Sequence, residues 1–419
     1  MPGKALTVTA LLCLSICALA QNKRLWVIRS SGEAVEYNPA TFSEKQTVKI
    51  PTGAAASLSA FSVNSQGQML FVPPAALPLM ETDLAAERKV WFWDGHQAST
   101  LTRDVSRTTS TAGSNLVIAE SAPTPFLSSD GKSLFWFSNQ ARRLQRDGVD
   151  LSTKNTWLSW QTDLAGANRQ EVATTSLPEC SCPTGGCEET CAYGQVWVPE
   201  SGVEKFFLLT QFVAGQTKPV YQSTSIFEEN TGKWTPAPVT PPLRNLLDVP
   251  NPDVILEAIP DTGCCGWSNE SDDQTVLHLR DKTLKVFDEI EAYKNPDYDV
   301  SFYTQNGKLS PDQKSVALTI VSTSKPNTPI QLAEQGQANP EESQHIRKAL
   351  ADLPAIEIKS VEDSPRRIAF LPHAQLVGWL SENEILMVED HLLVVYNVTT
   401  GARRKLPIHA EDAAHVFLR

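Results

Sequence analysis

A tight turn followed by an apolar strand recurs along this chain. The clearest copies are LSSDGKSLFWF (127–137) and LSPDQKSVALT (309–319), with a looser copy at VNSQGQMLFV (63–72) and a shortened one at LSENEILMV (380–388). In each copy, residues that favour a turn precede residues that favour a buried strand. The turn centres lie near residues 66, 130, 312 and 382, and the longest gap divides into three steps of about 61 residues. We therefore expect six tandem units of roughly 60–70 residues, beginning near residue 57.

Strand-like segments also occupy the rest of the chain. RLWVIRS (24–30), KFFLLTQFV (205–213) and LLVVYNV (392–398) are examples, and turn-forming residues bound most such runs. The 28 prolines argue against long helices. The sequence therefore predicts an all-β fold.

The repeated units resemble the WD40-like (PD40) repeats of TolB-type β-propellers. The resemblance rests on Ser129-Asp130-Gly131-Lys132 and on Ser310-Pro311-Asp312-Gln313-Lys314, where Gln313 stands in place of the turn glycine. TDLAGANRQEVAT (162–174) is similar to the outer strand and turn of such a blade. The resemblance implies a β-propeller and says almost nothing about function.

Both ends of the chain fit a closed ring. Residues 24–50 contain about three strand-like runs, and AHVFLR (414–419) contains one more. Together they would complete one four-stranded blade and remove an open sheet edge. With the six tandem units, this predicts about seven blades, with six or eight as alternatives. We expect residues 21–419 to form a single β-propeller domain.

The first twenty residues have the pattern of a secretory signal peptide: Lys4, an apolar run, and Ala-Leu-Ala before Gln21. The apolar run is shorter than the ~20 residues that a membrane-spanning helix needs. A lipid anchor on Cys17 is disfavoured because Ile16 precedes it where a small residue is expected. We expect an exported, periplasmic or secreted protein that is monomeric and does not insert into a membrane.

The charge balance excludes some partners. The chain has 48 acidic and 36 basic residues and a net charge of −12. Nucleic-acid binding requires clustered Lys and Arg, so nucleic acid is not expected as a partner. The two short basic clusters, ARRLQR (141–146) and ARRK (402–405), are interpreted as solvated strand ends or turns.

A long polar segment at 322–365 interrupts the strand pattern, and we expect one helix inside it. Asn339 can cap the helix, Pro340 suits its first turn, and Pro354 would end it. Such a helix either packs on the flank of the fold or acts as a lid or docking element.

The six cysteines that follow the predicted signal peptide form two groups, one in a Cys-rich loop at 178–193 and one adjacent pair. They are Cys180, Cys182, Cys187, Cys191, Cys264 and Cys265. An even number of cysteines in an exported chain favours disulfides, and the spacing differs from the paired knuckles of zinc sites. We expect bridges between the two groups and no metal, with a bond between the adjacent pair, a metal site and a redox or free-thiol role as alternatives.

Catalytic motifs are absent from the sequence. There is no G-x-S-x-G elbow and no H-E-x-x-H, and the seven histidines are scattered. No cofactor is expected. The candidate binding residues lie in DTGCCGWSNESDD (261–273) and are Asp261, Glu270, Asp272, Asp273 and Trp267. This loop is interpreted as a solvated acidic loop, with calcium binding or an acid/base pair as the functional alternatives.

Five tryptophans fall in predicted strands: Trp91, Trp93, Trp136, Trp157 and Trp160. Their alternation places partners on the same sheet face, either in packing between blades or in an aromatic platform for sugars or peptides.

These features favour an exported binding scaffold for a protein, peptide or glycan. The alternative is an enzyme that acts on carbohydrate or another small molecule, with carboxylates near the central channel. A purely structural role in the cell envelope is the third hypothesis.

Overall fold

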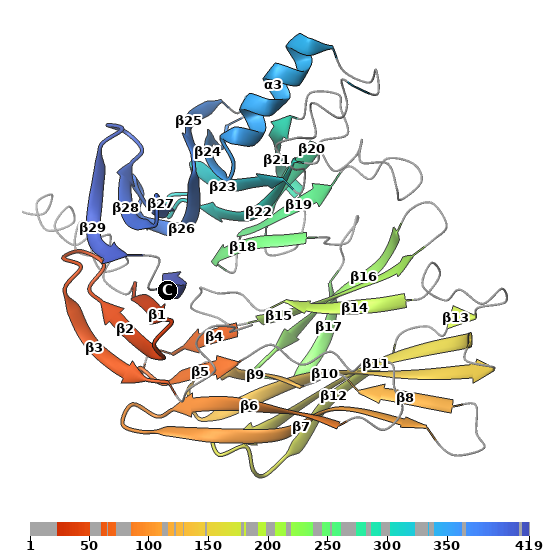
Figure 1. Ribbon diagram of the computed structural model, residues 1–419. Coiled ribbons are helices and arrows are strands. Elements are labelled where there is room, and N and C mark those ends of the chain that lie inside the picture. Colours follow the sequence, from red (N-terminus) through yellow and green to blue (C-terminus); the bar gives the residue numbers. More distant parts are fainter. Residues whose placement is uncertain are drawn as a thin grey trace, which may run out of the picture. The chain divides into compact units, whose positions relative to one another are not determined.

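The protein is an all-β chain of successive antiparallel sheets with one helix in an inserted loop (Figure 1). The computed structural model describes residues 23–50, 60–64, 66–72, 85–110, 116–120, 123–128, 130–146, 149–176, 180–181, 192–197, 206–214, 219–237, 245–251, 254–260, 274–281, 286–294, 302–322, 334, 339–362, 366–409 and 413–418. Within these ranges no helix is long and apolar enough to cross a membrane.

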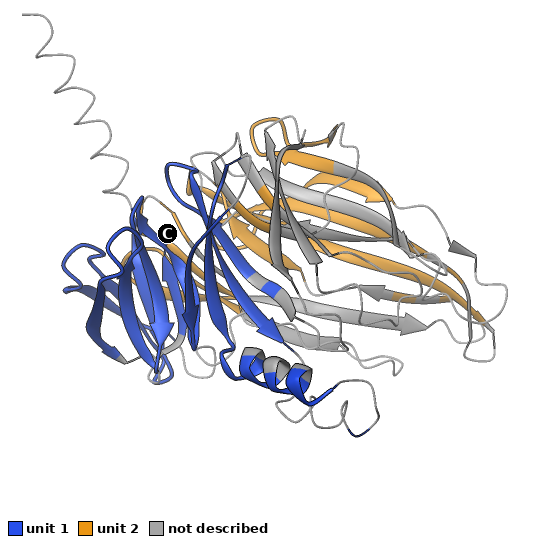
Figure 2. Ribbon diagram, turned by 90° about the horizontal axis from the view of Figure 1, so that it is seen from above, with its two compact units in different colours: residues 1–56, 304–419 blue, residues 57–303 orange. Residues whose placement is uncertain are grey.

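The chain divides into two compact units (Figure 2). Unit 1 contains residues 1–56 and 304–419, and unit 2 contains residues 57–303. Unit 1 is thus built from both ends of the chain.

One sheet of unit 1 joins the first and last strands of the chain. Its order is β3-β2-β1-β30. The strands are β1 (Leu25–Arg29), β2 (Glu33–Tyr37), β3 (Glu44–Lys49) and β30 (Ala413–Leu418). Leu25 pairs with Leu418 and Val27 with Val416 in antiparallel register. The prediction that the two ends build one four-stranded blade is confirmed.

Two further four-stranded sheets complete unit 1. The first contains β22 (Phe302–Leu309), β23 (Ser315–Ser322), β24 (Ala355–Ser360) and β25 (Arg367–Pro372). The second contains β26 (Ala374–Ser381), β27 (Glu384–Glu389), β28 (Leu392–Asn397) and β29 (Arg403–His409). Helix α3 (Pro340–Ala351) lies between β23 and β24 in the chain, as the capping signals predicted.

Unit 2 begins with a ten-stranded sheet. Its members are β4 (Ala60–Val63), β5 (Met69–Val72), β6 (Ala85–Trp93), β7 (Ala98–Ser110), β8 (Leu116–Glu120), β9 (Thr124–Leu127), β10 (Ser133–Arg146), β11 (Val149–Asp163), β12 (Gln170–Ser176) and β13 (Cys180–Ser181). It contains two four-stranded meanders, β4–β7 and β9–β12, and β8 joins them by pairing with both β7 and β10.

Two separate four-stranded sheets follow in unit 2. One contains β14 (Ala192–Trp197), β15 (Phe206–Ala214), β16 (Pro219–Glu228) and β17 (Lys233–Ala237). The other contains β18 (Asn245–Asn251), β19 (Val254–Pro260), β20 (Gln274–Asp281) and β21 (Val286–Lys294).

The described strands therefore form seven four-stranded sets, six of them in chain order and one completed by β30. This is the blade pattern of a β-propeller. The predicted fold class and the number of seven blades are confirmed.

The repeated turns share one hydrogen-bond pattern. Between β9 and β10, the Ser128 hydroxyl donates to Asp130 Oδ1 (2.6 Å), and the backbone N–H of Ser133 donates to Ser128 Oγ (3.0 Å). Between β22 and β23, Ser310 donates to Asp312 (2.6 Å), and the N–H of Ser315 donates to Ser310 Oγ (3.0 Å). The serine that matches Ser310 is thus Ser128. The hydrogen bond from Ser128 is the main reason that the pKa of Asp130 lies below its usual value.

Large side chains pack between consecutive blades of unit 1. Ile356 and Ile358 of β24 form a core with Trp379 and Met387 of the next blade. The indole N–H of Trp379 donates to the Lys308 carbonyl (2.9 Å), which satisfies the polar atom of a buried ring. A second core joins that blade to the terminal sheet through residues such as Leu25 and Leu386.

Unit 2 has the same arrangement. Leu70 and Phe92 of the β4–β7 meander pack with Trp136 and Trp160 of the β9–β12 meander. On the opposite face of the second meander, a separate core contains Phe135, Phe137 and Phe227, with Phe227 contributed by β16. Each meander is therefore sandwiched between neighbours, as propeller blades are.

Candidate functional site

Most of the predicted site residues fall outside the described part of the chain. These are Cys182, Cys187, Cys191, Cys264, Cys265, Asp261, Glu270, Asp272, Asp273 and Trp267. For Cys180 the structure gives the backbone, which begins β13. The disulfide and acidic-loop hypotheses therefore remain predictions.

The described strand ends show which edge of each sheet these segments leave from. Antiparallel strands alternate in direction, so successive connections alternate between two edges. Tight turns, such as residues 128–132 and 310–314, join first to second strands at one edge. At the other edge, residues 261–273 join β19 to β20, and residues 323–354 with α3 join β23 to β24. We call this second edge the long-loop edge of each unit.

Both cysteine groups belong to connections at the long-loop edge. The segment after β12, which contains β13 and the Cys-rich loop, leads to the first strand of the next sheet. The segment with Cys264 and Cys265 joins β19 to β20. Functional residues concentrate on long loops held by a rigid scaffold, so this edge is the first place to look for a site.

A long hairpin projects at the long-loop edge of unit 2. β10 has 14 residues and β11 has 15, and they are the longest strands drawn in Figure 1. β9 pairs with β10 over residues 134–137 alone. Beyond it, β8 pairs with residues 140–144 of β10, and β13 pairs with residues 152–153 of β11. We call residues 140–156 the arm.

The arm ties the Cys-rich segment to the scaffold. Cys180 pairs with Thr153, so β13 is hydrogen-bonded to the outer part of β11. β8 supports the other side of the arm through five residue pairs. The arm is thus a supported sheet extension, held on both sides by segments that link blades.

Two cations face one another on the arm. Arg142 of β10 lies directly opposite Lys154 of β11, and Arg142 is exposed while Lys154 is partly exposed. Directly opposed side chains in an antiparallel pair have Cβ atoms about 4.5–5.5 Å apart, and like charges there destabilise the sheet. Within the described ranges neither side chain has a carboxylate within ion-pair distance. By contrast, Arg367 and Arg403 form close pairs with Glu357 (2.6 Å) and Glu389 (2.9 Å).

Apolar side chains lie on the same face as these cations. Leu144 is two residues beyond Arg142 and is 43% exposed, one of the two large hydrophobic residues exposed in the described chain. Ile118 of β8 pairs with Arg142, and Leu116 pairs with Leu144. We call Leu116, Ile118, Arg142, Leu144 and Lys154 the arm patch. It combines unpaired positive charge with exposed apolar surface.

The sequence analysis did not find the arm. It placed strands at 133–138 and 156–163 and interpreted 141–146 as a strand end or turn, because the intervening residues are polar. The signal that could have found it is Asp147-Gly148, since Asp-Gly between strand residues favours a two-residue hairpin turn.

The five tryptophans serve packing between blades. Trp136 and Trp160 are buried and stack with centroids 6.3 Å apart, and Trp91 is buried as well. Trp157 packs in the other core of its blade, so Trp157 and Trp160 lie on opposite faces, contrary to the expectation of a shared face. The aromatic platform is therefore not supported by Trp91, Trp136 or Trp160, whose rings are not available to a ligand.

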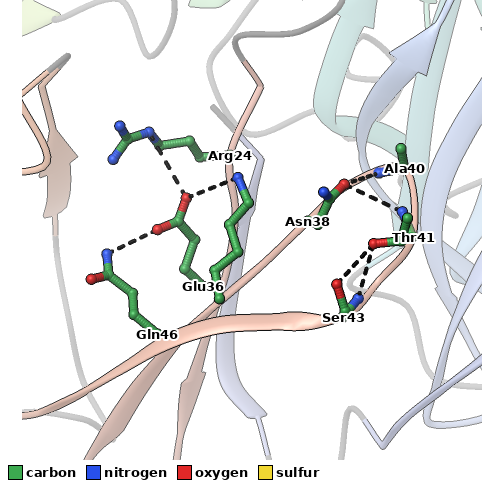
Figure 3. A network of polar contacts seen from close by, with 8 residues as sticks. Arg24, Glu36, Asn38, Ala40, Thr41, Ser43 and Gln46 are labelled. Atoms are coloured by element: carbon green, nitrogen blue, oxygen red, sulfur yellow. Dashed lines mark hydrogen bonds and ion pairs between the residues drawn. The ribbon is translucent and has the colours of Figure 1, made fainter.

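Buried carboxylates of unit 1 are satisfied by neighbouring cations and donors. Figure 3 shows Glu36 of β2, which accepts a hydrogen bond from Gln46 Nε2 (2.8 Å) and lies 3.9 Å from Arg24 Nε. Lys45 Nζ lies 3.8 Å from the same carboxylate. These contacts stabilise a buried charge and leave no acid poised for proton transfer.

A second polar cluster on the terminal sheet centres on Tyr37. Its hydroxyl accepts a hydrogen bond from Arg29 (3.1 Å) and donates one to Glu44 (3.2 Å). Burial raises the pKa of Tyr37, and the hydrogen bond with Tyr37 is the main cause that raises the pKa of Arg29. Both groups therefore keep their ordinary protonation states, Tyr37 neutral and Arg29 charged, at neutral pH.

Metal-binding geometry was also sought. In the ranges that the structure describes, no three His, Cys, Asp or Glu side chains are grouped so that they could hold a metal ion. His96, His373 and His391 are exposed on turns.

No protein-family model matches the chain, and no curated protein matches it. Among solved structures, the chain is similar to dihydro-heme d1 dehydrogenase NirN, with 11% identity, 93% of this chain and 74% of that chain covered, and a TM-score of 0.42. It is similar to the β-propeller domain of the trilobed protease from Pyrococcus furiosus, with 11% identity, 90% of each chain covered and a TM-score of 0.40. A third similarity is to dipeptidyl peptidase 4 of Porphyromonas gingivalis, with 8% identity, 94% of this chain and 61% of that chain covered, and a TM-score of 0.41. At these values the similarities carry no argument about activity.

Proposed function

We propose that this chain is an exported binding scaffold for a protein, peptide or glycan, and that it binds its ligand at the long-loop edge. The observation that carries the proposal is the arm. A hairpin of this length adds nothing to the packing between blades, yet segments from two different blade connections support it.

A supported arm suits recognition for a physical reason. Binding costs free energy whenever flexible groups must be ordered, and a site on a hydrogen-bonded sheet loses less conformational entropy than a site on a free loop. The stiff blades beneath the arm hold it in place in the same way. The export of the chain rests on the signal-peptide pattern of residues 1–20.

The test is to select ligands and map where they bind. Residues 21–419 would be purified and screened against a displayed peptide library and a glycan array. Hydrogen exchange with the selected ligand should slow at the arm or at strand ends of the long-loop edge. Turns of the opposite edge, such as residues 163–170, serve as the internal control.

Two outcomes would contradict the proposal. Protection confined to the tight turns of the opposite edge would place binding on the wrong side. Turnover of chromogenic glycosides, abolished by changing Glu270, Asp272 or Asp273 to the amide, would establish the enzyme hypothesis instead.

A further inference from the structure

We propose that the arm patch is the docking site for an acidic peptide segment of a partner protein, in which an Asp or Glu is followed two residues later by an apolar residue. This inference rests on the proposed binding function and names its partner chemistry.

The first step is the placement of Arg142 and Lys154. Two like charges opposite one another lower the stability of the isolated sheet, and no carboxylate among the described residues offsets this. The chain has an excess of acidic residues, so a basic pair without a partner runs against its composition. A carboxylate from a partner would accept hydrogen bonds from both cations at once and remove the repulsion.

The second step is the spacing on the same face. Leu144 lies two residues beyond Arg142 on β10, which is roughly 6.6–6.8 Å along a strand. An extended peptide has the same repeat. Its carboxylate at one position can therefore meet Arg142 and Lys154 while an apolar side chain two residues later contacts Leu144 and Leu116.

The third step separates a peptide from an acidic glycan. A carboxylated or sulfated glycan would match the cations but has no apolar side chain for Leu144, Leu116 and Ile118. Burial of exposed apolar area contributes roughly 25 cal/mol per Å², so this half of the patch favours a peptide.

The net charge of the protein affects the range of the attraction. An acidic partner is repelled at long range by a chain of charge −12. This repulsion is screened beyond about 8 Å at physiological ionic strength. The arm projects beyond the flanking strands β9 and β12, so a local attraction at its cations can dominate at contact.

The experiment measures the fluorescence anisotropy of a labelled ten-residue peptide that contains two Glu-x-Leu repeats, titrated with residues 21–419. The matched peptide with Gln in place of each Glu and a labelled oligogalacturonate serve as competing probes. We expect Arg142→Ala and Lys154→Ala each to weaken binding of the acidic peptide by roughly tenfold, and Leu144→Ser by about fivefold. Raising the salt concentration should weaken binding by the wild-type protein more than by either Ala variant.

Lys132→Ala is the matched control. Lys132 is an exposed lysine of the same blade, on the tight turn at the opposite edge, and lies 3.9 Å from Asp130. This variant should bind as the wild type does. Arg142→Ala should also unfold at an equal or higher denaturant concentration than the wild type, since it removes a like-charge pair, so lost binding cannot be ascribed to unfolding.

The inference is overturned if Arg142→Ala and Lys154→Ala bind the peptide as the wild type does, if the Gln peptide binds equally well, or if the oligogalacturonate binds and the peptide does not. A ligand that binds another part of the long-loop edge would sink this inference while the proposed function stands.

Discussion

Positions 131 and 313 occupy the same place in two copies of one turn but carry different residues. Gly131 has a φ of 69° and Gln313 a φ of 61°, both in the left-handed region. An L-residue there costs about 1–2 kcal/mol, and glycine costs about 0.5–1 kcal/mol in chain entropy. We expect Gln313→Gly to raise the free energy of unfolding by about 0.5–1 kcal/mol, measured by urea denaturation.

The reverse change at the equivalent position is the control. A Cβ added at Gly131 would lie 2.5 Å from Asn64 Nδ2 and 2.9 Å from Gln68 Oε1. Gly131→Ala should therefore lower stability by about 1–2 kcal/mol. Equal effects of the two substitutions would show that the turns are not equivalent.

Glu357 is a buried carboxylate at the centre of β24. Its side chain is 1% exposed, and Arg367 Nε donates to Oε1 at 2.6 Å while Lys359 Nζ lies 3.7 Å from Oε2. We expect Glu357→Gln to lower the free energy of unfolding by about 2–3 kcal/mol, because a charge-assisted hydrogen bond in a buried site is weakened. Thermal or chemical denaturation measures this.

Glu362→Gln is the matched substitution on an exposed pair. Glu362 lies 4.0 Å from Arg366, and both side chains are more than half exposed. Its effect should be within about 0.5 kcal/mol. A comparable loss from both substitutions would argue against a special role for burial at Glu357.

At the scale of elements, α3 is anchored near its C-terminal end. Leu350 is buried, whereas Arg347 and Lys348 are exposed. We expect Leu350→Ala to cost about 2 kcal/mol locally and to speed tryptic cleavage after Arg347 and Lys348. Glu341→Ala on the exposed first turn is the control. Unchanged cleavage in Leu350→Ala would show that the helix is not held by this residue.

The sequence predicted the elements whose residues carry a local signal. The turn units, the capped helix and the terminal strands each combine turn or cap residues with an apolar pattern. The extension of β10 and β11 does not, because Ala141 to Arg146 and Leu151 to Asn155 are mostly polar and are stabilised by pairing with β8 and β13. Such tertiary pairing overrides local propensity.

The candidate site followed the same division. The sequence analysis selected cysteines and carboxylates, whose chemistry is visible in their side chains. Arg142 and Lys154 are twelve residues apart and become neighbours through the register of one hairpin. Only that register shows that two ordinary surface cations face each other without a carboxylate.

At the scale of the whole molecule, the two cysteine groups lead from strand ends at the long-loop edge of unit 2. β13 fixes Cys180 beside Thr153 of the arm. We expect disulfides between the 180–191 group and Cys264 or Cys265, detected by mass spectrometry of non-reduced peptides. Six free thiols with bound zinc, or a bond between Cys264 and Cys265, would contradict this prediction.

The sharing of one sheet by the two ends of the chain is the feature on which the fold depends. It could be predicted because residues 24–50 supply three strands, one short of a blade, and the last residues supply the fourth. Every other set of four strands is local in sequence. The terminal sheet alone joins residues nearly 400 positions apart.

Hydrogen exchange of the intact protein tests this feature most directly. Peptides covering β1 and β30 should exchange slowly and at the same rate as those covering β27 and β28, whose side chains share a core with β1. If either terminal peptide exchanges within seconds while β27 and β28 remain protected, the ends do not form one blade and the account of the fold is wrong.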